Sequence, residues 1–235
     1  MQKIHKILIG IAFSPNLEPN LFEAIRIANM FNAELIGVHV GKKNARKEEN
    51  LRKILELADA LNTPLKTIWQ EGEPVDVILK TSVDEHIDLL ILGALQKEKL
   101  LKYYVGSIAR KITRKATCSI LLLIKPSIIR QFCKHIVVNG LKDDKTEETI
   151  KTSVLFARHL LCKKMTIVEE ISQSELQVKV NDDKSLRKST IVKERLKIRE
   201  DQRVKNILKD INCDDISIKT QSIFGTRGYS IGHYA

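Results

Sequence analysis

A strand–helix–strand pattern that occurs twice is the feature of this chain that most constrains its fold. Residues 6–11 form a short apolar run bounded by turn residues, which is typical of a buried strand. Residues 21–31 carry apolar side chains at helical spacing, and a second strand-like run follows at 34–40. The same order returns in the second half, at 135–138, 150–161 and 165–168. Alternating strands and helices predict an α/β fold of parallel sheets with right-handed crossovers and helices on both faces.

The two copies of the pattern differ in length. After Gly72 the first copy runs for 52 residues to Ile124, through a strand, a loop, a helix and a last strand. Only 10 residues follow Gly225 in the second copy. We therefore expect a complete first domain at 1–126 and a second domain at 133–235 that is truncated before its fourth strand and its ligand loop. Either the gene is truncated or the chain is a fragment.

The composition argues against membrane-spanning, secreted and zinc-binding classes. Hydrophobic residues make up 43% of the chain, and no apolar stretch reaches the ~18 residues that a membrane span needs. The four cysteines form no Cys-x-x-Cys pair, so neither a disulfide framework nor a metal site is indicated. We expect a reduced, cytoplasmic protein with no membrane partner.

The net charge of +11 raises the question of nucleic-acid binding. Basic residues gather at 97–130 and at 184–209. Nucleic-acid binders usually add aromatic stacking residues or a recognisable reading module to such segments, whereas aromatic residues are only 5% of this chain. We therefore favour solvated, lysine-rich helix faces over a nucleic-acid interface.

The segment from Gly93 to Ser107 has the layout of a phosphate-binding loop. Gly93 ends an apolar run, and Ser107 opens a helical pattern. In α/β folds such a loop holds phosphate on backbone N–H groups at the positive end of a helix dipole. Gln96 stands where a glycine would let the backbone approach an oxygen closely. A bound anion is expected on the first residues of the helix: Gly106, Ser107, Ile108 and Ala109. Ser107 has an alternative role as a simple N-cap.

With these motifs the chain resembles the universal stress protein (UspA) family in tandem form. The resemblance covers nearly the whole chain and is strongest at 6–40 and 72–124. It implies an open five-stranded, Rossmann-like sheet of the adenine nucleotide hydrolase type, with helices on both faces, and a role in stress response. Nucleotide-binding members carry a Gly-x2-Gly-x9-Gly-(Ser/Thr) motif, which falls here on Gly93, Gln96, Gly106 and Ser107.

The resemblance also implies where a nucleotide would bind. In nucleotide-binding members an acidic residue just after the first strand recognises the nucleoside, and this position is Ala12. The residue that ends the second strand contacts adenine through its backbone, and this position is Val40. The candidate nucleotide-binding residues are therefore Gly10, Ile11, Ala12, Val40, Gly93, Gln96, Gly106, Ser107, Ile108 and Ala109.

Two departures from the family motif weaken the predicted site. Ala12 cannot accept a hydrogen bond from a ribose or a base, which costs about 1–3 kcal/mol if those groups stay unpaired. Gln96 brings a long side chain into a loop that must fold around phosphates, although its amide can itself donate. We expect no required cofactor and ATP as a weak ligand of a degenerate site. The alternative is an ATP-binding switch with slow hydrolysis.

The sequence supplies no catalytic constellation. No nucleophile has a nearby base, and no Gly-x-Ser-x-Gly elbow is present. His39 ends a strand in an apolar context and is expected to be a buried histidine with satisfied hydrogen bonds. The predicted function is therefore non-catalytic, in stress response.

The last strand of the first domain predicts a homodimer. Its residues suit a strand that is buried on both faces: Ser119, Ile120, Leu121, Leu122, Leu123 and Ile124. The last strand of such a sheet is often an edge with unpaired backbone groups. In related stress proteins this strand pairs with its counterpart across a two-fold axis or between tandem domains. The second domain here ends before its counterpart, so we expect the edge to recruit another chain.

Overall fold

A computed structural model of the chain describes residues 3–58, 64–94, 107–172, 182–225 and 230–234. The chain divides into two compact units, 2–131 and 132–235, and each is described by itself. Among the described residues, no helix is both long enough and apolar enough to cross a membrane.

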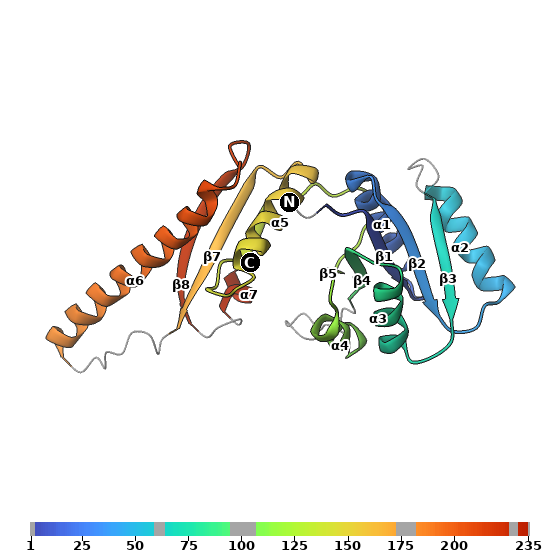
Figure 1. Cartoon of the computed structure of the whole chain (residues 1–235), viewed down its shortest axis with the longest axis horizontal. Coiled ribbons are helices and arrows are strands. Elements are labelled where there is room, and N and C mark those ends of the chain that lie inside the picture. Colours follow the sequence, from blue (N-terminus) through green and yellow to red (C-terminus); the bar gives the residue numbers. More distant parts are fainter. Residues whose placement is uncertain (1–2, 59–63, 95–106, 173–181, 226–229, 235) are drawn as a thin grey trace. The chain divides into compact units, whose positions relative to one another are not determined.

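The first unit is built on one parallel sheet of five strands (Figure 1). The strands are β1 (Lys6–Ile11), β2 (Glu34–Val40), β3 (Leu65–Gln70), β4 (Leu89–Gly93) and β5 (Ser119–Leu123). Their spatial order is β3-β2-β1-β4-β5. The helices are α1 (Leu17–Phe31), α2 (Ala45–Ala58), α3 (Pro74–Asp84) and α4 (Ser107–Lys115). The predicted α/β fold with an open five-stranded parallel sheet is therefore confirmed.

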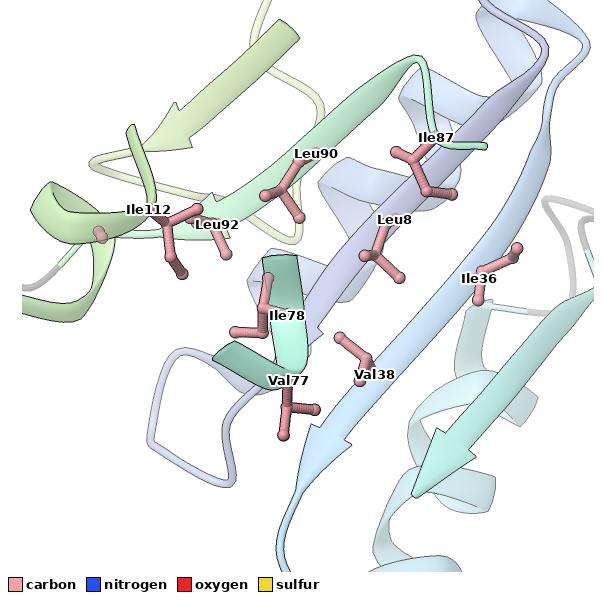
Figure 2. Packing of buried hydrophobic residues seen from close by; sticks show 10 residues of the cluster. Leu8, Ile36, Val38, Val77, Ile78, Ile87, Leu90, Leu92 and Ile112 are labelled. Carbon is pink, nitrogen blue, oxygen red and sulfur yellow. The ribbon is translucent and has the colours of Figure 1, made fainter. Parts of the chain in front are cut away.

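Helices cover both faces of this sheet because its strands are apolar on both sides. Side chains from β1, β2 and β4 meet α3 and α4 in one buried cluster, which includes Leu8, Val38, Leu90, Ile78 and Ile112 (Figure 2). The alternate residues of the same strands, such as Ile7 and Leu35, are also fully buried. They lie on the face from which α1 and α2 pack.

Local sequence explains where α3 begins. Gly72 has a φ of +143°, which side chains other than glycine rarely adopt, so the chain can turn sharply after β3. Pro74 then occupies the first position of the helix, where its missing N–H costs nothing.

The strand order reverses between β1 and β4, and this places the two strands side by side although they are far apart in sequence. The Asp88 carboxylate accepts hydrogen bonds from the backbone N–H groups of His5 (2.8 Å) and Lys6 (3.0 Å), so the starts of the two strands are tied together. In open α/β sheets, ligands bind beyond the carboxyl ends of the strands at such a reversal.

One boundary of the predicted last strand is wrong. Ile124 was expected in the strand, but β5 ends at Leu123, which pairs with Gly93, the last residue of β4. Because β4 is the partner of β5 within the sheet, the end of β4 also ends the paired length of β5.

The second unit repeats the first part of this plan. Its parallel sheet has the order β6-β7-β8, formed by β6 (Ile136–Asn139), β7 (Lys164–Ser172) and β8 (Ser217–Gly225). The helices are α5 (Thr146–His159), α6 (Asp183–Lys209) and α7 (Ser230–Tyr234). Val138, Ile150, Val154, Met165 and Val204 belong to its buried core. Its described residues thus contain the counterparts of β1, β2 and β3.

Helix α6 is the longest helix of the described chain, with 27 residues. Its start is fixed by a capping box, in which the Asp182 carboxylate accepts from the Ser185 N–H at 2.7 Å and the Ser185 hydroxyl pairs with the Asp182 N–H.

Candidate functional site

The structure brings half of the predicted nucleotide-binding residues to one edge of the first sheet. Gly10 and Ile11 end β1, with Ala12 next in the chain, while Val40 ends β2 and Gly93 ends β4. Because these strands are parallel neighbours, their carboxyl ends lie together.

The remaining predicted residues belong to the loop and to α4. Ser107, Ile108 and Ala109 form the first turn of α4. Ile108 is exposed, whereas the Ala109 side chain is buried in the core under the helix. Gln96 and Gly106 lie outside the described residues. The anion-binding role of Ser107, Ile108 and Ala109 therefore stays a prediction.

The two glycines at the strand ends are explained by packing. A Cβ atom on Gly10 would lie 3.0 Å from the Leu92 Cδ2 atom. A Cβ atom on Gly93 would lie 2.5 Å from the Asn20 Nδ2 atom, because the Asn20 side chain of α1 rests on the end of β4. The Asn20 Oδ1 atom is buried and has no hydrogen-bond partner among the described residues. Asn20 is therefore a polar neighbour of the site that the sequence did not indicate.

Three rings form a cluster at the ends of β1, β2 and β3. His39 of β2 lies edge-on to Phe13, with ring centroids 4.8 Å apart, and edge-on to Trp69 of β3 at 4.9 Å. The Lys47 ammonium of α2 lies 5.5 Å from the Phe13 centroid, within range of a cation–π contact. The cluster occupies the strand ends beside Ala12 and Val40.

The hydrogen bonds of His39 define its protonation. Its Nδ1 atom is 2.9 Å from the Ile11 carbonyl oxygen, and its Nε2 atom is 3.0 Å from the Lys47 Nζ atom. A carbonyl only accepts and an ammonium only donates. Nδ1 therefore carries the proton, Nε2 accepts, and the imidazole is neutral. The prediction of a buried histidine with satisfied hydrogen bonds is confirmed.

A groove of about 430 Å³ runs beside this cluster, between α2 and the edge strand β3. Its apolar floor is formed by Leu51, Leu55 and Trp69. Arg52 of α2 is held at the rim by ion pairs with Glu49 and Glu56. The groove is separate from the elements that carry Gly93 and Ser107.

The corresponding position of the second unit holds buried carboxyl groups in place of aromatic rings. β7 runs beyond the end of β6 and carries Glu169 and Glu170, which are 2% and 4% exposed. The Glu170 Oε1 atom accepts a hydrogen bond of 2.7 Å from the Ile231 N–H of α7. Glu169 faces α6, where Glu200 and Arg203 enclose a cavity of about 30 Å³ with it.

Arg203 connects the polar groups around this cavity. Its Nε atom donates to Glu200 at 2.9 Å, and its Nη2 atom donates to the Gly140 carbonyl. Nη2 is 3.9 Å from Glu169 Oε1, which is too far for a hydrogen bond, so this interaction is electrostatic. Glu169 Oε1 has no hydrogen-bond partner among the described residues, whereas Oε2 accepts from the Ser222 hydroxyl at 3.0 Å.

The two glutamates that contact Arg203 have opposite pKa shifts. Burial raises the pKa of Glu169 to about 7, against the lowering effects of the Ser222 hydroxyl and of Arg203. Burial also acts to raise the pKa of Glu200, but hydrogen bonds from Arg203 and Arg199 outweigh it and hold the pKa below its usual value. Glu169 is thus the less stabilised carboxylate of the pair.

In both units a side chain donates a hydrogen bond to the backbone carbonyl at the equivalent position at the end of the first strand. Gly140 follows β6 and lies next to Glu169, as Ile11 lies next to His39 in the register of β1 and β2. The carbonyl of Ile11 accepts from His39, and the carbonyl of Gly140 accepts from Arg203. The repeat therefore extends to this detail of the sheet edge, with a different donor in each unit.

Both ring nitrogens of His39 are already engaged, so this residue is not available as a general base. Within the described ranges, no group of three or more His, Cys, Asp and Glu residues is placed to hold a metal ion.

Comparison with known proteins identifies relatives of the first unit. Residues 3–123 match the model of the Universal stress protein family. Universal stress protein YxiE from Bacillus subtilis is 26% identical over an alignment of 146 residues, which covers 51% of this chain and 98% of YxiE. Universal stress protein MJ0531 from Methanocaldococcus jannaschii is 26% identical over an alignment of 122 residues, which covers 44% of this chain and 72% of the relative.

A solved structure extends the similarity to both units. A protein of unknown function from Pseudomonas aeruginosa matches with a TM-score of 0.70 at 15% identity, over 99% of this chain and 78% of its own length. This match supports the tandem fold. Because the family model covers more than half of the residues and both curated relatives carry the same family name, the chain belongs to the universal stress protein family.

Proposed function

We propose that this universal stress protein is a non-catalytic, cytoplasmic stress-response protein with a degenerate adenine-nucleotide site in its first unit. The observation that carries the proposal is the internal pairing at the ends of β1 and β2. The polar groups there, the Ile11 carbonyl and both nitrogens of His39, already bond within the chain. Ala12 adds no acceptor for a ribose or a base.

The balance of contributions explains why binding should be weak. The first turn of α4, which includes Ser107, has N–H groups without an intrahelical acceptor and the positive end of a helix dipole, whose attraction for an anion is about 0.3–1 kcal/mol. The absent acceptor at Ala12 removes about 1–3 kcal/mol from nucleoside recognition. Phosphate attraction therefore does not compensate for the lost nucleoside contact, and no cofactor is required.

Restoring the family pattern is expected to tighten ATP binding. The double variant Ala12→Asp with Gln96→Gly regains an acceptor beside the nucleoside position and a loop residue without a side chain. We expect its dissociation constant, measured by isothermal calorimetry, to fall at least tenfold, which corresponds to about 1.4 kcal/mol. Ala45→Asp adds the same charge at an exposed position and serves as the control. Micromolar affinity of the unmodified chain for ATP would contradict the proposal.

The second candidate function is an ATP-binding switch with slow hydrolysis. It is favoured by the reversal of strand order between β1 and β4, with Gly93 and the start of α4 at the position where such folds hold nucleotides. A purified chain that carries a co-purifying adenine nucleotide and releases phosphate from it would establish this function in place of the first.

A homodimer through β5 is part of the proposed function. β5 pairs with β4 on one side, and its other edge has no partner strand among the described residues of the unit. The Ser119 N–H donates to the Asp88 carbonyl, so Ser119, Leu121 and Leu123 point their backbone groups towards β4. The backbone groups of Ile120 and Leu122 therefore point to the free edge, where a second β5 strand can pair with them.

Proline at position 122 is expected to abolish this dimer. Leu122→Pro removes an N–H group that faces the free edge, while the ladder to β4 keeps its bonds. Light scattering at tens of micromolar should then show the 26.8 kDa monomer, and the unmodified chain should show twice that mass. Leu122→Val keeps the N–H and should remain dimeric. An unmodified chain that is monomeric at this concentration would refute the dimer.

A further inference from the structure

The outer side of α6 is a continuous basic face. With 3.6 residues per turn, ten residues fall within a sector of about 100°, and all ten are exposed. We call this sector the basic face of α6; it consists of Lys184, Arg187, Lys188, Ile191, Arg195, Ile198, Gln202, Lys205, Asn206 and Lys209. The four acidic residues of the helix lie outside the sector. At 1.5 Å per residue the face is about 38 Å long.

Helix stability does not explain where these charges lie. Basic side chains are favourable near the end of a helix and unfavourable near its start, yet Lys184, Arg187 and Lys188 lie in the first two turns of α6. Lys184 and Lys188 are also a like-charged pair at i,i+4, which is destabilising. Acidic residues would stabilise the helix more at these positions.

Most of the basic face is also not used in ion pairs. Among the described residues, the basic side chains of α6 that form ion pairs are Lys197, Arg199, Arg203 and Lys205. Of these, only Lys205 belongs to the basic face. The first half of the basic face, up to Arg195, therefore presents four cations to an external partner: Lys184, Arg187, Lys188 and Arg195.

Two isoleucines lie in the middle of the cations. Ile191 and Ile198 are seven residues apart, two turns along the same side, and their exposed fractions are 53% and 61%. Exposed aliphatic side chains contribute nothing to a contact with phosphates alone. They gain free energy when they enter the boundary between lipid headgroups and acyl chains.

We propose that the basic face of α6 binds a membrane surface rich in anionic phospholipid. The cations contact lipid phosphates and carboxylates, and Ile191 and Ile198 enter the headgroup layer. Clusters of four to eight basic residues on a helix are typical of such binding. The basic face is less suited to binding in the major groove of a nucleic acid. The opposite side of α6 is buried through Ser189, Glu200 and Val204, so the helix presents a low ridge, whereas reading helices enter a groove about 12 Å wide.

The test is flotation of the full chain with vesicles at 0.1 M NaCl. Binding is expected to vesicles of phosphatidylcholine with 30% phosphatidylserine, and not to vesicles of phosphatidylcholine alone. Each basic residue contributes about fivefold to the partition coefficient, so the variant Lys184→Gln, Arg187→Gln, Lys188→Gln, Arg195→Gln should lose about a hundredfold or more. The charge-neutral change Ile191→Ala with Ile198→Ala should lose about tenfold.

A matched variant distinguishes an effect of the basic face from an effect of the total charge of the chain. Lys42→Gln, Lys80→Gln, Lys115→Gln and Lys125→Gln remove four exposed charges from the first unit and should bind vesicles like the unmodified chain. An equal loss in this variant would overturn the proposal, because the total charge and not α6 would then be responsible. Binding to duplex DNA that depends on the basic face, without vesicle binding, would overturn it in favour of nucleic acid. Binding to neither would leave the face as solvated charge and would also overturn it.

Discussion

Replacing Arg203 with alanine is expected to lower the free energy of unfolding of the second unit by about 3 kcal/mol at pH 8. The change removes the donor to the Gly140 carbonyl and one of the partners of Glu200. It also removes the cation 3.9 Å from Glu169, whose carboxylate is almost completely buried. A buried charge that loses its partner typically costs about 3–5 kcal/mol, and the partial exposure of Arg203 places the effect at the low end.

The chain contains its own internal control for this measurement. Trp69 is the only tryptophan and lies in the first unit, so its fluorescence reports the unfolding of that unit alone. Circular dichroism at 222 nm reports both units. Arg203→Ala should move a dichroism transition to lower urea without moving the Trp69 transition. Arg195→Ala, an exposed change on the same helix, should move neither. A shift for Arg203→Ala below 1 kcal/mol would contradict the structural role assigned to this side chain.

Replacing Glu169 with glutamine is expected to have the opposite effect, a stabilisation of the second unit by about 2 kcal/mol at pH 8. Burial raises the pKa of Glu169 to about 7 from its ordinary value of 4.5. The folded state therefore holds this proton more tightly than the unfolded state. The stability that the proton contributes is fully present below pH 4.5 and is lost as the pH rises through 7. Glutamine cannot ionise, so the variant avoids this loss.

The difference in unfolding free energy between the Glu169→Gln variant and the unmodified protein should therefore depend on pH. At pH 5 the variant and the unmodified protein should unfold at nearly the same urea concentration, because Glu169 is protonated in the folded state. At pH 8 the dichroism transition of the variant should lie at higher urea. Glu148→Gln removes an exposed carboxylate from α5 and should show no such dependence. A stabilisation that is the same at pH 5 and pH 8 would rule out the ionisation of Glu169 as its cause.

The sheet was predictable because its signal is local. Each strand of the first unit is a short apolar run, and the helix after it shows apolar residues at helical spacing, so alternation alone predicts parallel pairing. Parallel pairing in turn brings the strand ends at Ile11, Val40 and Gly93 to one edge. The family resemblance contributed the number of strands, whereas the order β3-β2-β1-β4-β5 was not predicted and comes from the structure.

The unpredicted parts of the sites depend on contacts between distant segments. Asn20 lies on a helix with no polar motif around it, and only the packing of α1 on the sheet brings it to Gly93. Glu169 and Glu170 follow the predicted strand 165–168, a position where carboxylates are usually solvated, whereas β7 continues through them to Ser172. Their burial results from α6 and α7, whose positions no local pattern reveals. The sequence analysis predicted a solvated, lysine-rich helix face at 184–209, but it did not identify the exposed isoleucines within that face.

The reversal of strand order between β1 and β4 has a consequence for the order in which the first unit folds. Lys6 pairs with Glu34 and Leu89 pairs with Ser119, so these neighbours close chain loops of about 30 residues. Ile7 pairs with Leu89, 82 positions further along the chain. The entropic cost of closing this longer loop exceeds that of the loops of about 30 residues by about 1 kcal/mol of free energy. The β1–β4 pairing is therefore expected to form late, and the edge that carries Gly10 and Gly93 comes into existence only when the sheet is nearly complete.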